Sequence, residues 1–570
     1  MPVVNLTKSR LEEQLPEIPL DRLLEALPFI GLDIEGEDET AIRVEYNPNR
    51  PDYSSQYGIV RALKGLLEIE IGMPKLAISG SSGVSIKVEP AAAALRPFVV
   101  ALAATGGRLD DDDIRQLVAM QEDLHNGLGR KRRKASIGVH NMDRIRPPLL
   151  YKAVDSGFSF VPLGETKKMS MLEVLEKTDT GITYAPLASD WKERGSFPII
   201  CDSRGTVLSF PPIINGADTQ VDVTCRNLLV EVTATSRVTA LDILAVIGMN
   251  LSDAGFKIRS VKVIERSKAE ITPEFRAKKI FTTPTFLNQI VGTSLSPRQV
   301  LHCLKKCRLG ASLSGKRIVC TIPRYRTDIQ SEIDLAEELS IGYGIQNLLP
   351  SLPSVFSAGS RSLQSMRFDA IRSALVGLGM IENLSFSLTG QGSGDGPVSD
   401  TQQAGARISV DSSKSAEHVL LRSSLVPSLL QALSRNVHEH YPQRLFEIGR
   451  VFTLSESNAV SEKWMVAAAI CHPDADFVEA LSSARAVLEL SLGLNGLVTR
   501  RLQDGAGNME TLPSQSSLYI NGRHAELVVG GKNSGHVGEI APAVLEALRL
   551  RMPASVFELD LSAVQEKTNT

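Results

Sequence analysis

The spacing of apolar residues along the chain predicts helices and strands in four successive segments. In the first segment, an apolar run at 3–6 and an alternating run at 42–46 predict strands, and the periodicity at 20–31 predicts a helix. The turn formers NPNRPD at 47–52 precede a second helix. These elements predict a small N-terminal α/β domain over residues 1–80.

Strands and helices continue to alternate in the second segment. A Gly/Ser-rich stretch, SGSSG at 79–83, is typical of a linker between the two segments. After it, the apolar runs FVVALAAT and LLVEVTAT predict strands, and IRQLVAMQEDLHNGL between them predicts a helix. This mixture predicts an α+β domain with a mixed sheet over residues 85–265.

The last two segments differ in size. Residues 270–347 predict a small winged-helix-like unit, with a helix that starts at Ser296-Pro297, the strand RIVCTIP and a second helix from about Ser331. The stretch PSLPSVFSAG at 350–359 predicts a linker. Evenly spaced strands over 355–570 favour an antiparallel sheet flanked by helices. The predicted fold class is therefore α+β and multidomain.

Length and composition exclude several classes of protein. A chain of 570 residues is too long for one hydrophobic core, and its 43% apolar and 22% charged residues are typical of a soluble globular protein. The net charge of −3 excludes a polycation, so any nucleic-acid contact must come from local basic patches. Six scattered cysteines predict no disulfide framework, and no apolar stretch reaches the roughly 18 residues of a membrane span. We expect a cytoplasmic protein without membrane association.

Carboxylates gather in the segment PRYRTDIQSEIDLAEELSIGYG at 323–344. Asp334, Glu337 and Glu338 stand at i, i+3 and i+4, so they share one helix face, and Asp328 lies just before the helix. Four hard oxygen donors this close together suit Mg²⁺. The alternative is a solvated acidic helix face behind a capping box.

In that alternative, Thr327 and Gln330 form the capping box, and Arg324 and Arg326 lie beside the acidic face. The residues alone leave both interpretations open.

Two further segments carry polar side chains in suggestive patterns. The run GRKRRK at 129–134 could contact phosphates or form a solvated loop, and His140 near Asp143 could serve acid–base chemistry or be structural. Glu231 and Thr233 alternate on one strand face. They follow a loop that Pro211-Pro212 bends.

A tight turn at Asn215-Gly216 lies between that loop and the strand. The whole segment predicts either a small-ligand pocket or a strand with one solvated face. Phosphate-loop, nucleophile-elbow and zinc-protease motifs are absent from the sequence.

Four segments together resemble the β-subunits of phenylalanyl-tRNA synthetases of the archaeal and eukaryotic-cytosolic type. NPNRPDYSSQYGIVRALKGL at 47–66 is similar to the N-terminal signature of that family, and 323–344 resembles its B5 domain. YPQRLFEIGRVF at 441–452 and HVGEIAPAVLEAL at 536–548 resemble its C-terminal module. The resemblance covers nearly the whole chain in the right order.

This resemblance implies a division of labour. The C-terminal module is expected to be an inactive copy of the class II synthetase core, so we assign no activation residues and interpret Arg422 and Arg444 as fold or interface residues. An α-subunit is expected to hold the activation site, in an (αβ)₂ heterotetramer that uses ATP to attach phenylalanine to tRNA(Phe).

The resemblance also implies two sites on this chain. One Mg²⁺ ion is expected on Asp328, Asp334, Glu337 and Glu338. The segment at 85–265 resembles the B3/B4 editing domain, which hydrolyses tyrosyl-tRNA.

In that domain we expect Glu231 and Thr233, with Ser209 and Asn215 as secondary candidates, to form the editing pocket. Glu231 would read the tyrosine hydroxyl, and water would be the nucleophile. The family often has aspartate where Glu231 stands, which shifts the carboxylate by about one bond length. The alternative function is a free-standing tRNA-binding or trans-editing protein without an obligate partner.

Overall fold

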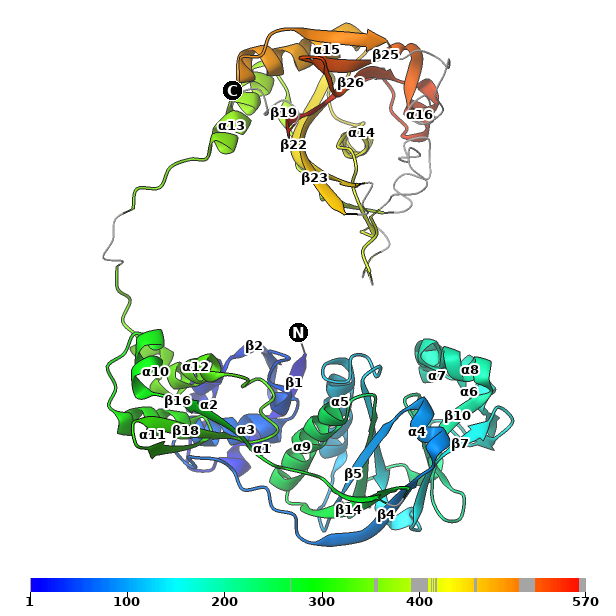
Figure 1. Cartoon of the computed structure of the whole chain (residues 1–570), viewed down its shortest axis with the longest axis vertical. Helices are drawn as coiled ribbons and strands as arrows, with labels where there is room; N and C mark the ends of the chain where they lie inside the picture. Colours follow the sequence, from blue (N-terminus) through cyan, green and yellow to red (C-terminus); the bar gives the residue numbers. More distant parts are fainter. Residues whose placement is uncertain are drawn as a thin grey trace. The chain divides into compact units, whose positions relative to one another are not determined.

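The structure, a computed structural model, forms two compact units that span residues 1–352 and 353–570 (Figure 1). The residues that it describes are 2–266, 268–352, 357–390, 408–411, 413, 415, 418–455, 459–501 and 518–562. The boundary at 352/353 falls inside the predicted Pro/Ser linker, part of which lies outside the described residues. Each unit has its own hydrophobic core.

A three-stranded sheet in the order β1-β3-β2 opens the first unit. Its strands are β1 (Val3–Thr7), β2 (Leu32–Glu37) and β3 (Ala41–Tyr46), and its helices are α1 (Lys8–Gln14), α2 (Leu20–Ala26) and α3 (Gln56–Leu66). The predicted strands and helices are all present. Strand β2 was not predicted, because only Leu32 of its residues is buried and no alternation marks it.

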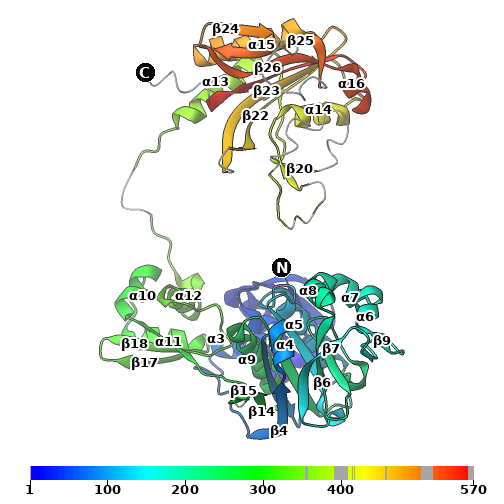
Figure 2. The same ribbon diagram turned by 45° about the vertical axis from the view of Figure 1, so that its right-hand side comes forward.

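A mixed sheet of ten strands dominates the first unit (Figure 2). The order is β12-β11-β10-β7-β4-β14-β5-β13-β6, and β15 pairs with β14. Strand β4 runs parallel to β7 and β14, whereas the other pairs are antiparallel, which confirms the predicted mixed sheet. The strands are β4 (Ser81–Val88), β5 (Phe98–Thr105), β6 (Ala135–Asn141), β7 (Leu149–Asp155), β10 (Ser196–Cys201), β11 (Val207–Phe210), β12 (Ile214–Asn215), β13 (Asn227–Ala234), β14 (Lys257–Glu265) and β15 (Lys268–Thr272).

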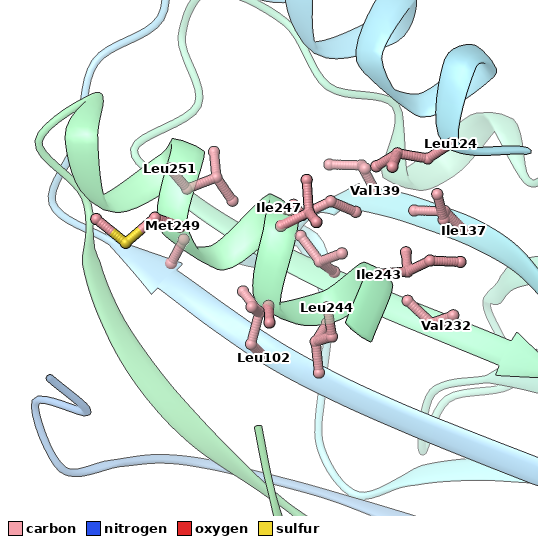
Figure 3. Close-up of a cluster of buried hydrophobic side chains, with 14 of the residues drawn as sticks. Leu102, Leu124, Ile137, Val139, Val232, Ile243, Leu244, Ile247, Met249 and Leu251 are labelled. Carbon is pink, nitrogen blue, oxygen red and sulfur yellow. The ribbon is translucent and has the colours of Figure 1, made fainter. Parts of the chain in front are cut away.

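Helix α9 (Arg237–Asp253) packs its apolar side chains on this sheet. Figure 3 shows Ile243, Leu244 and Ile247 of α9 among side chains of the sheet and of α5 (Asp111–Asn126). Each fully buried leucine or isoleucine of this kind contributes about 1.5–3 kcal/mol. This core fixes the positions of β6, β13 and α5, which carry most of the candidate site.

The predicted linker at 79–83 is wrong in its second half. Ser81 pairs with Ser260 at the start of β4, and the hydroxyl of Ser82 donates to the Ser260 carbonyl at 2.7 Å. Glycine and serine lack the apolar side chains that mark a strand, yet their backbone groups still form the sheet's hydrogen bonds.

A smaller sheet, in the order β16-β18-β17, completes the first unit. Its strands are β16 (Lys278–Thr282), β17 (Gly310–Ser314) and β18 (Arg317–Ile322), and its helices are α10 (Pro284–Val291), α11 (Pro297–Lys306) and α12 (Glu332–Tyr343). Ser296 caps α11 as predicted. The cap of α12 is Ser331 with Asp334, so the capping box of Thr327 with Gln330 that the alternative interpretation assumed is wrong.

The second unit contains a sheet of seven described strands in the order β19-β22-β23-β27-β26-β25-β24. Only β19 runs parallel to its neighbour, so the predicted antiparallel sheet is largely confirmed. The strands are β19 (Ile381–Glu382), β22 (Gln443–Leu454), β23 (Val460–Cys471), β24 (Leu497–Arg501), β25 (Tyr519–Val529), β26 (Lys532–Ile540) and β27 (Ala554–Asp560), and the main helices are α13 (Leu363–Gly377), α14 (Val426–Arg435), α15 (Phe477–Ala486) and α16 (Pro542–Ala547). Within the described ranges, no helix combines the length and apolar character that a membrane span needs.

Candidate functional site: a polar pocket on the mixed sheet

A pocket of about 320 Å³ lies in the first unit, on one face of the mixed sheet. Its described lining comes mostly from α5, β6, β13 and the segment 209–221, with Arg132, Leu163 and Thr180 in addition. Three of the four predicted editing residues line it: Glu231, Ser209 and Asn215. The volume is within the usual range for a small-molecule site.

Glu231 is buried on β13, with only 2% of its surface exposed. Its two cross-strand neighbours are Ala101 on β5 and Gly138 on β6, and both are small. A Cβ atom on Gly138 would come within 2.5 Å of Glu231 Oε1 and 2.6 Å of His140 Nε2. Glycine at this position therefore leaves room for both functional side chains.

Only one of the two carboxylate oxygens of Glu231 accepts a hydrogen bond. Ser209 Oγ donates to Oε1 at 2.8 Å, and His140 Nε2 lies 3.9 Å from the same oxygen. Glu231 Oε2 and His140 Nε2 are both buried without a hydrogen-bond partner among the residues that the structure describes. An unsatisfied buried carboxylate oxygen is costly, so a ligand hydroxyl that donated to Oε2 would gain a strong hydrogen bond.

Thr233 does not line the pocket. Its hydroxyl accepts a hydrogen bond from Arg96 Nε at 3.0 Å and shares one with Ser136 Oγ at 2.9 Å. Ser136 does line the pocket, two residues from Gly138 on β6. The structure therefore places Thr233 behind the pocket wall, where it holds Ser136 and Arg96.

Arg132 is the one residue of the basic run 130–134 whose side chain is buried. Its guanidinium donates to the Ile213 carbonyl at 2.8 Å and to Glu122 at 2.7 Å, and it lies 4.3 Å from the ring centroid of Tyr184. Arg132 thereby ties the bent loop at 211–213 to helix α5.

The backbone of the loop that carries Arg132 is unusual. Arg130, Lys131 and Arg132 all have positive φ, of 51°, 52° and 63°. Each costs about 1–2 kcal/mol in this left-handed region, which side chains with a Cβ rarely adopt. The burial and hydrogen bonds of Arg132 help to hold the loop in this conformation.

His125 supports the same wall from α5. Its Nε2 accepts from the Ile137 backbone N–H at 2.8 Å, so Nδ1 carries the proton and donates to Glu122 at 3.1 Å. This hydrogen bond and the positive charge of Arg132 together lower the pKa of Glu122 to about 2. Glu122 therefore stays ionised at neutral pH and remains a partner for Arg132.

The predicted metal ligands lie at the start of α12. Asp328 and Glu338 both accept hydrogen bonds from the buried guanidinium of Arg326, with Arg326 Nη2 2.6 Å from Asp328 Oδ2. Asp334 accepts from the backbone N–H groups of Gln330 and Ser331 at 2.7 Å each.

Glu337 is exposed on the same helix. Among the residues that the structure describes, no three His, Cys, Asp or Glu side chains are arranged to hold a metal ion. The four carboxylates therefore share one end of α12 without meeting at one point.

The two arginines singled out in the second unit have carboxylate partners there. Arg422 donates to Glu447 at 2.6 Å and to the Arg450 carbonyl at 2.9 Å, and Arg444 donates to Glu479 at 2.8 Å. Arg422 and Glu447 are both buried. These contacts agree with a role in the fold.

Sequence reasoning missed several residues of the pocket. Glu122 and His125 lie on a predicted helix with no distinguishing signal, and Arg132 stands among equally basic neighbours. His140 was noted in the sequence, but the signal that separates it from a structural histidine is its strand register beside Gly138 and Glu231.

Comparison with known proteins identifies the family. Residues 345–561 match the family described as "Phenylalanyl tRNA synthetase beta chain CLM domain", and residues 280–345 match "tRNA synthetase B5 domain". The chain is 37% identical to the phenylalanine–tRNA ligase β-subunit of Archaeoglobus fulgidus, over 99% of this chain and 98% of that protein. It is 34% identical to the Methanocaldococcus jannaschii β-subunit, over 98% and 100%.

A solved structure agrees with this assignment. The crystal structure of an N-terminal fragment of the phenylalanyl-tRNA synthetase β-subunit from Pyrococcus horikoshii superposes with a TM-score of 0.57 and 30% identity, covering 60% of this chain and 99% of the fragment. The four sequence segments predicted the same assignment: this chain belongs to the family of phenylalanine–tRNA ligase β-subunits and is an aminoacyl-tRNA ligase subunit.

Proposed function

We propose that this β-subunit proofreads the charging of tRNA(Phe), and that the pocket around Glu231 hydrolyses tyrosine attached to that tRNA. The observation that carries the proposal is the buried Glu231 carboxylate, whose Oε2 has no hydrogen-bond partner inside a pocket of about 320 Å³. A tyrosine hydroxyl donating to Oε2 would satisfy it, whereas phenylalanine would leave it unpaired.

The need for such a site follows from the chemistry of the two amino acids. A synthetic site built for phenylalanine is apolar, and it rejects a substrate that merely adds a hydroxyl by only about a hundredfold. A second site that hydrogen-bonds the hydroxyl discriminates in the opposite direction, because its buried polar groups remain unsatisfied by phenylalanine. The polar pocket of this chain has the required chemistry.

Each pocket residue has a distinct part in this proposal. Glu231 receives the tyrosine hydroxyl, Ser209 holds the carboxylate through its 2.8 Å hydrogen bond, and Asn215 lines the pocket from β12, where it pairs with Ser209. Thr233 positions Ser136 from behind. Water attacks the ester carbonyl, which breaks the bond to the tRNA ribose and releases free tyrosine.

Hydrolysis of the two charged tRNAs tests this function. The purified complex of this chain with its α-subunit should deacylate tyrosyl-tRNA(Phe) at least about a hundredfold faster than phenylalanyl-tRNA(Phe). Equal rates for the two esters would contradict the proposed proofreading.

We further propose that the second unit docks an α-subunit, in an (αβ)₂ assembly whose α-subunit binds ATP. Large apolar side chains are exposed on α13, at β19 and in the segment after it, including Leu363, Ile381, Leu384 and Phe386. Leu384 and Phe386 are 83% and 79% exposed. Exposure of several large apolar side chains on neighbouring elements supports a protein interface here.

The magnesium site on α12 is a further part of the proposal. Asp328, Asp334, Glu337 and Glu338 offer hard oxygen donors, the ligands that Mg²⁺ prefers. Although Glu337 is exposed, partial desolvation of its carboxyl raises its pKa, and the negative charges of Glu338, Asp328 and Asp334 raise it further. The repulsion at Glu337 supports a cation site, because a bound cation would relieve it, and its role would be to stabilise the small unit. Asp328 and Glu338 would have to exchange part of their pairing with Arg326 for the ion.

Replacing Glu337 by glutamine should therefore abolish the stabilisation by magnesium. A carboxyl whose pKa is raised by folding costs stability once the pH exceeds its unfolded pKa, so Glu337→Gln should raise the Tm at pH 7 in EDTA. Millimolar Mg²⁺ should raise the Tm of the wild type but not of the variant. Differential scanning fluorimetry of the full chain measures both, and an equal response of the two proteins to Mg²⁺ would rule out Glu337 as a ligand.

A further inference from the structure

A second and larger hollow, the basic groove, lies in the first unit with a volume of about 980 Å³. Its walls are the turn at 48–49, the end of α5 with the loop after it, the start of α9, and the segments 274–278 and 322–330. Six lining side chains are basic and three are acidic: Arg130, Lys134, Arg276, Lys278, Arg324 and Arg326 against Asp242, Glu274 and Asp328. The lining therefore carries an excess of positive charge.

All three acidic side chains in the groove already have cationic partners. Asp242 accepts from Arg324 at 2.9 Å, Asp328 pairs with Arg326, and Glu274 lies 3.7 Å from Arg237. Neutralised carboxylates contribute little to the potential of the groove. The positive charges that remain therefore set its preference for a ligand.

Four of the basic side chains have no such partner, and one of them, Lys278, donates to the Gln330 carbonyl at 2.8 Å instead. Arg130, Lys134 and Arg276 are exposed, and no carboxylate within the described ranges forms an ion pair with them. They come from two segments, the loop after α5 and the stretch before β16, so the unpaired charges occur on two walls of the groove. This arrangement suits an extended anion better than a single small one.

We propose that the basic groove binds the phosphate backbone of a structured RNA. None of its described lining residues is aromatic or histidine, so they offer no platform on which unpaired bases could stack. The same lack of aromatic anchors argues against an acidic protein partner, because protein interfaces are enriched in tyrosine and tryptophan. The basic side chains of the groove can therefore recognise an RNA through its phosphates.

The position of the groove connects it to the proofreading pocket. Arg130 and Lys134 line the groove, whereas Arg132, on the same strained loop, lines the pocket. The end of α5 is shared in the same way, since His125 lines the pocket and Asn126 lines the groove. RNA held by its phosphates in the groove would thus lie beside the pocket that receives its esterified end, an inference that rests on the proposed function.

The salt dependence of RNA binding tests the groove in the intact complex with the α-subunit. The triple variant Arg130→Ala, Lys134→Ala and Arg276→Ala should bind uncharged tRNA(Phe) at least about tenfold more weakly at physiological salt. The slope of log K against log salt should fall by about one for each lost phosphate contact, so by about three in all. A matched control removes three exposed cations elsewhere in the unit: Lys167, Lys168 and Arg298.

The outcomes separate the groove from the proposed function. Phenylalanine-dependent ATP–pyrophosphate exchange needs no tRNA and should be unchanged in the variant, which also shows that the complex is folded. An unchanged salt slope or an unchanged affinity for RNA in the variant would overturn the groove proposal. Gel filtration of the same sample shows whether the α-subunit is still bound. A wild-type complex that binds RNA through the groove but does not deacylate tyrosyl-tRNA would refute proofreading and leave the groove standing.

Discussion

Tyrosyl-tRNA(Phe) should accumulate when Glu231 is replaced by alanine, while phenylalanine charging stays near the wild-type rate. The substitution removes the carboxylate that the tyrosine hydroxyl would reach, together with the acceptor for Ser209. A hydrogen bond to a charged group is worth about 1.5–3 kcal/mol, so deacylation of tyrosyl-tRNA should slow by about 10- to 150-fold. The measurement is single-turnover hydrolysis by the complex with the α-subunit.

Two controls make the Glu231 result specific. Glu231→Gln retains the shape and one acceptor oxygen, so it should lose less activity than the alanine variant. Glu193→Ala changes an exposed glutamate of α8 (Ser189–Arg194) in the same unit and should behave as wild type. If Glu231→Ala hydrolysed tyrosyl-tRNA at the wild-type rate, the assignment of the pocket would be wrong.

Loss of Glu338 should destabilise the chain more than loss of any exposed carboxylate on the same helix. Only 2% of the Arg326 side chain and 6% of the Glu338 side chain are exposed. Breaking a buried ion pair by removing one partner costs about 3–5 kcal/mol. Because Asp328 still pairs with Arg326, the loss for Glu338→Ala should fall near about 3 kcal/mol, the lower end of that range. The first unfolding transition in urea measures it.

Glu332→Ala is the matched control for this loss, because Glu332 is exposed on the first turn of α12. Its effect should stay within about 0.5 kcal/mol. Replacing both members of the buried pair, with Arg326→Met and Glu338→Leu, should recover much of the stability, since no charge is then left unpaired. A Glu338→Ala variant as stable as the Glu332→Ala control would contradict the buried pair.

Strands buried on both faces were the elements that the sequence predicted best. The run at 98–105 forms β5 with the same bounds, because a strand inside a sheet covered on both faces needs apolar side chains at nearly every position. Strand β2 and the start of β4 lack that signal, since β2 is mostly exposed and β4 begins with serines. Their pairing partners, which are distant in sequence, decide their structure.

In the candidate site, too, contacts between residues distant in sequence were beyond prediction. The resemblance to the family placed Glu231, Ser209 and Asn215 in one pocket, and the structure brings them together. Arg132 could not be separated from its basic neighbours by sequence, because its burial depends on a left-handed loop and on carbonyls about 80 residues away.

The acidic end of α12 was recognised as a cluster from residue spacing alone. The structure adds that Arg326 reaches Glu338, twelve residues further along the chain. Spacing cannot reveal this contact, since it depends on how the segment before the helix folds back onto it.

The division of labour between the subunits is tested most directly by assaying each alone and both together. This chain by itself should show neither phenylalanine-dependent ATP–pyrophosphate exchange nor charging of tRNA(Phe), because its second unit is expected to be a docking module. Adding the α-subunit should restore both activities at wild-type rates. Phenylalanine charging by this chain alone would contradict the account.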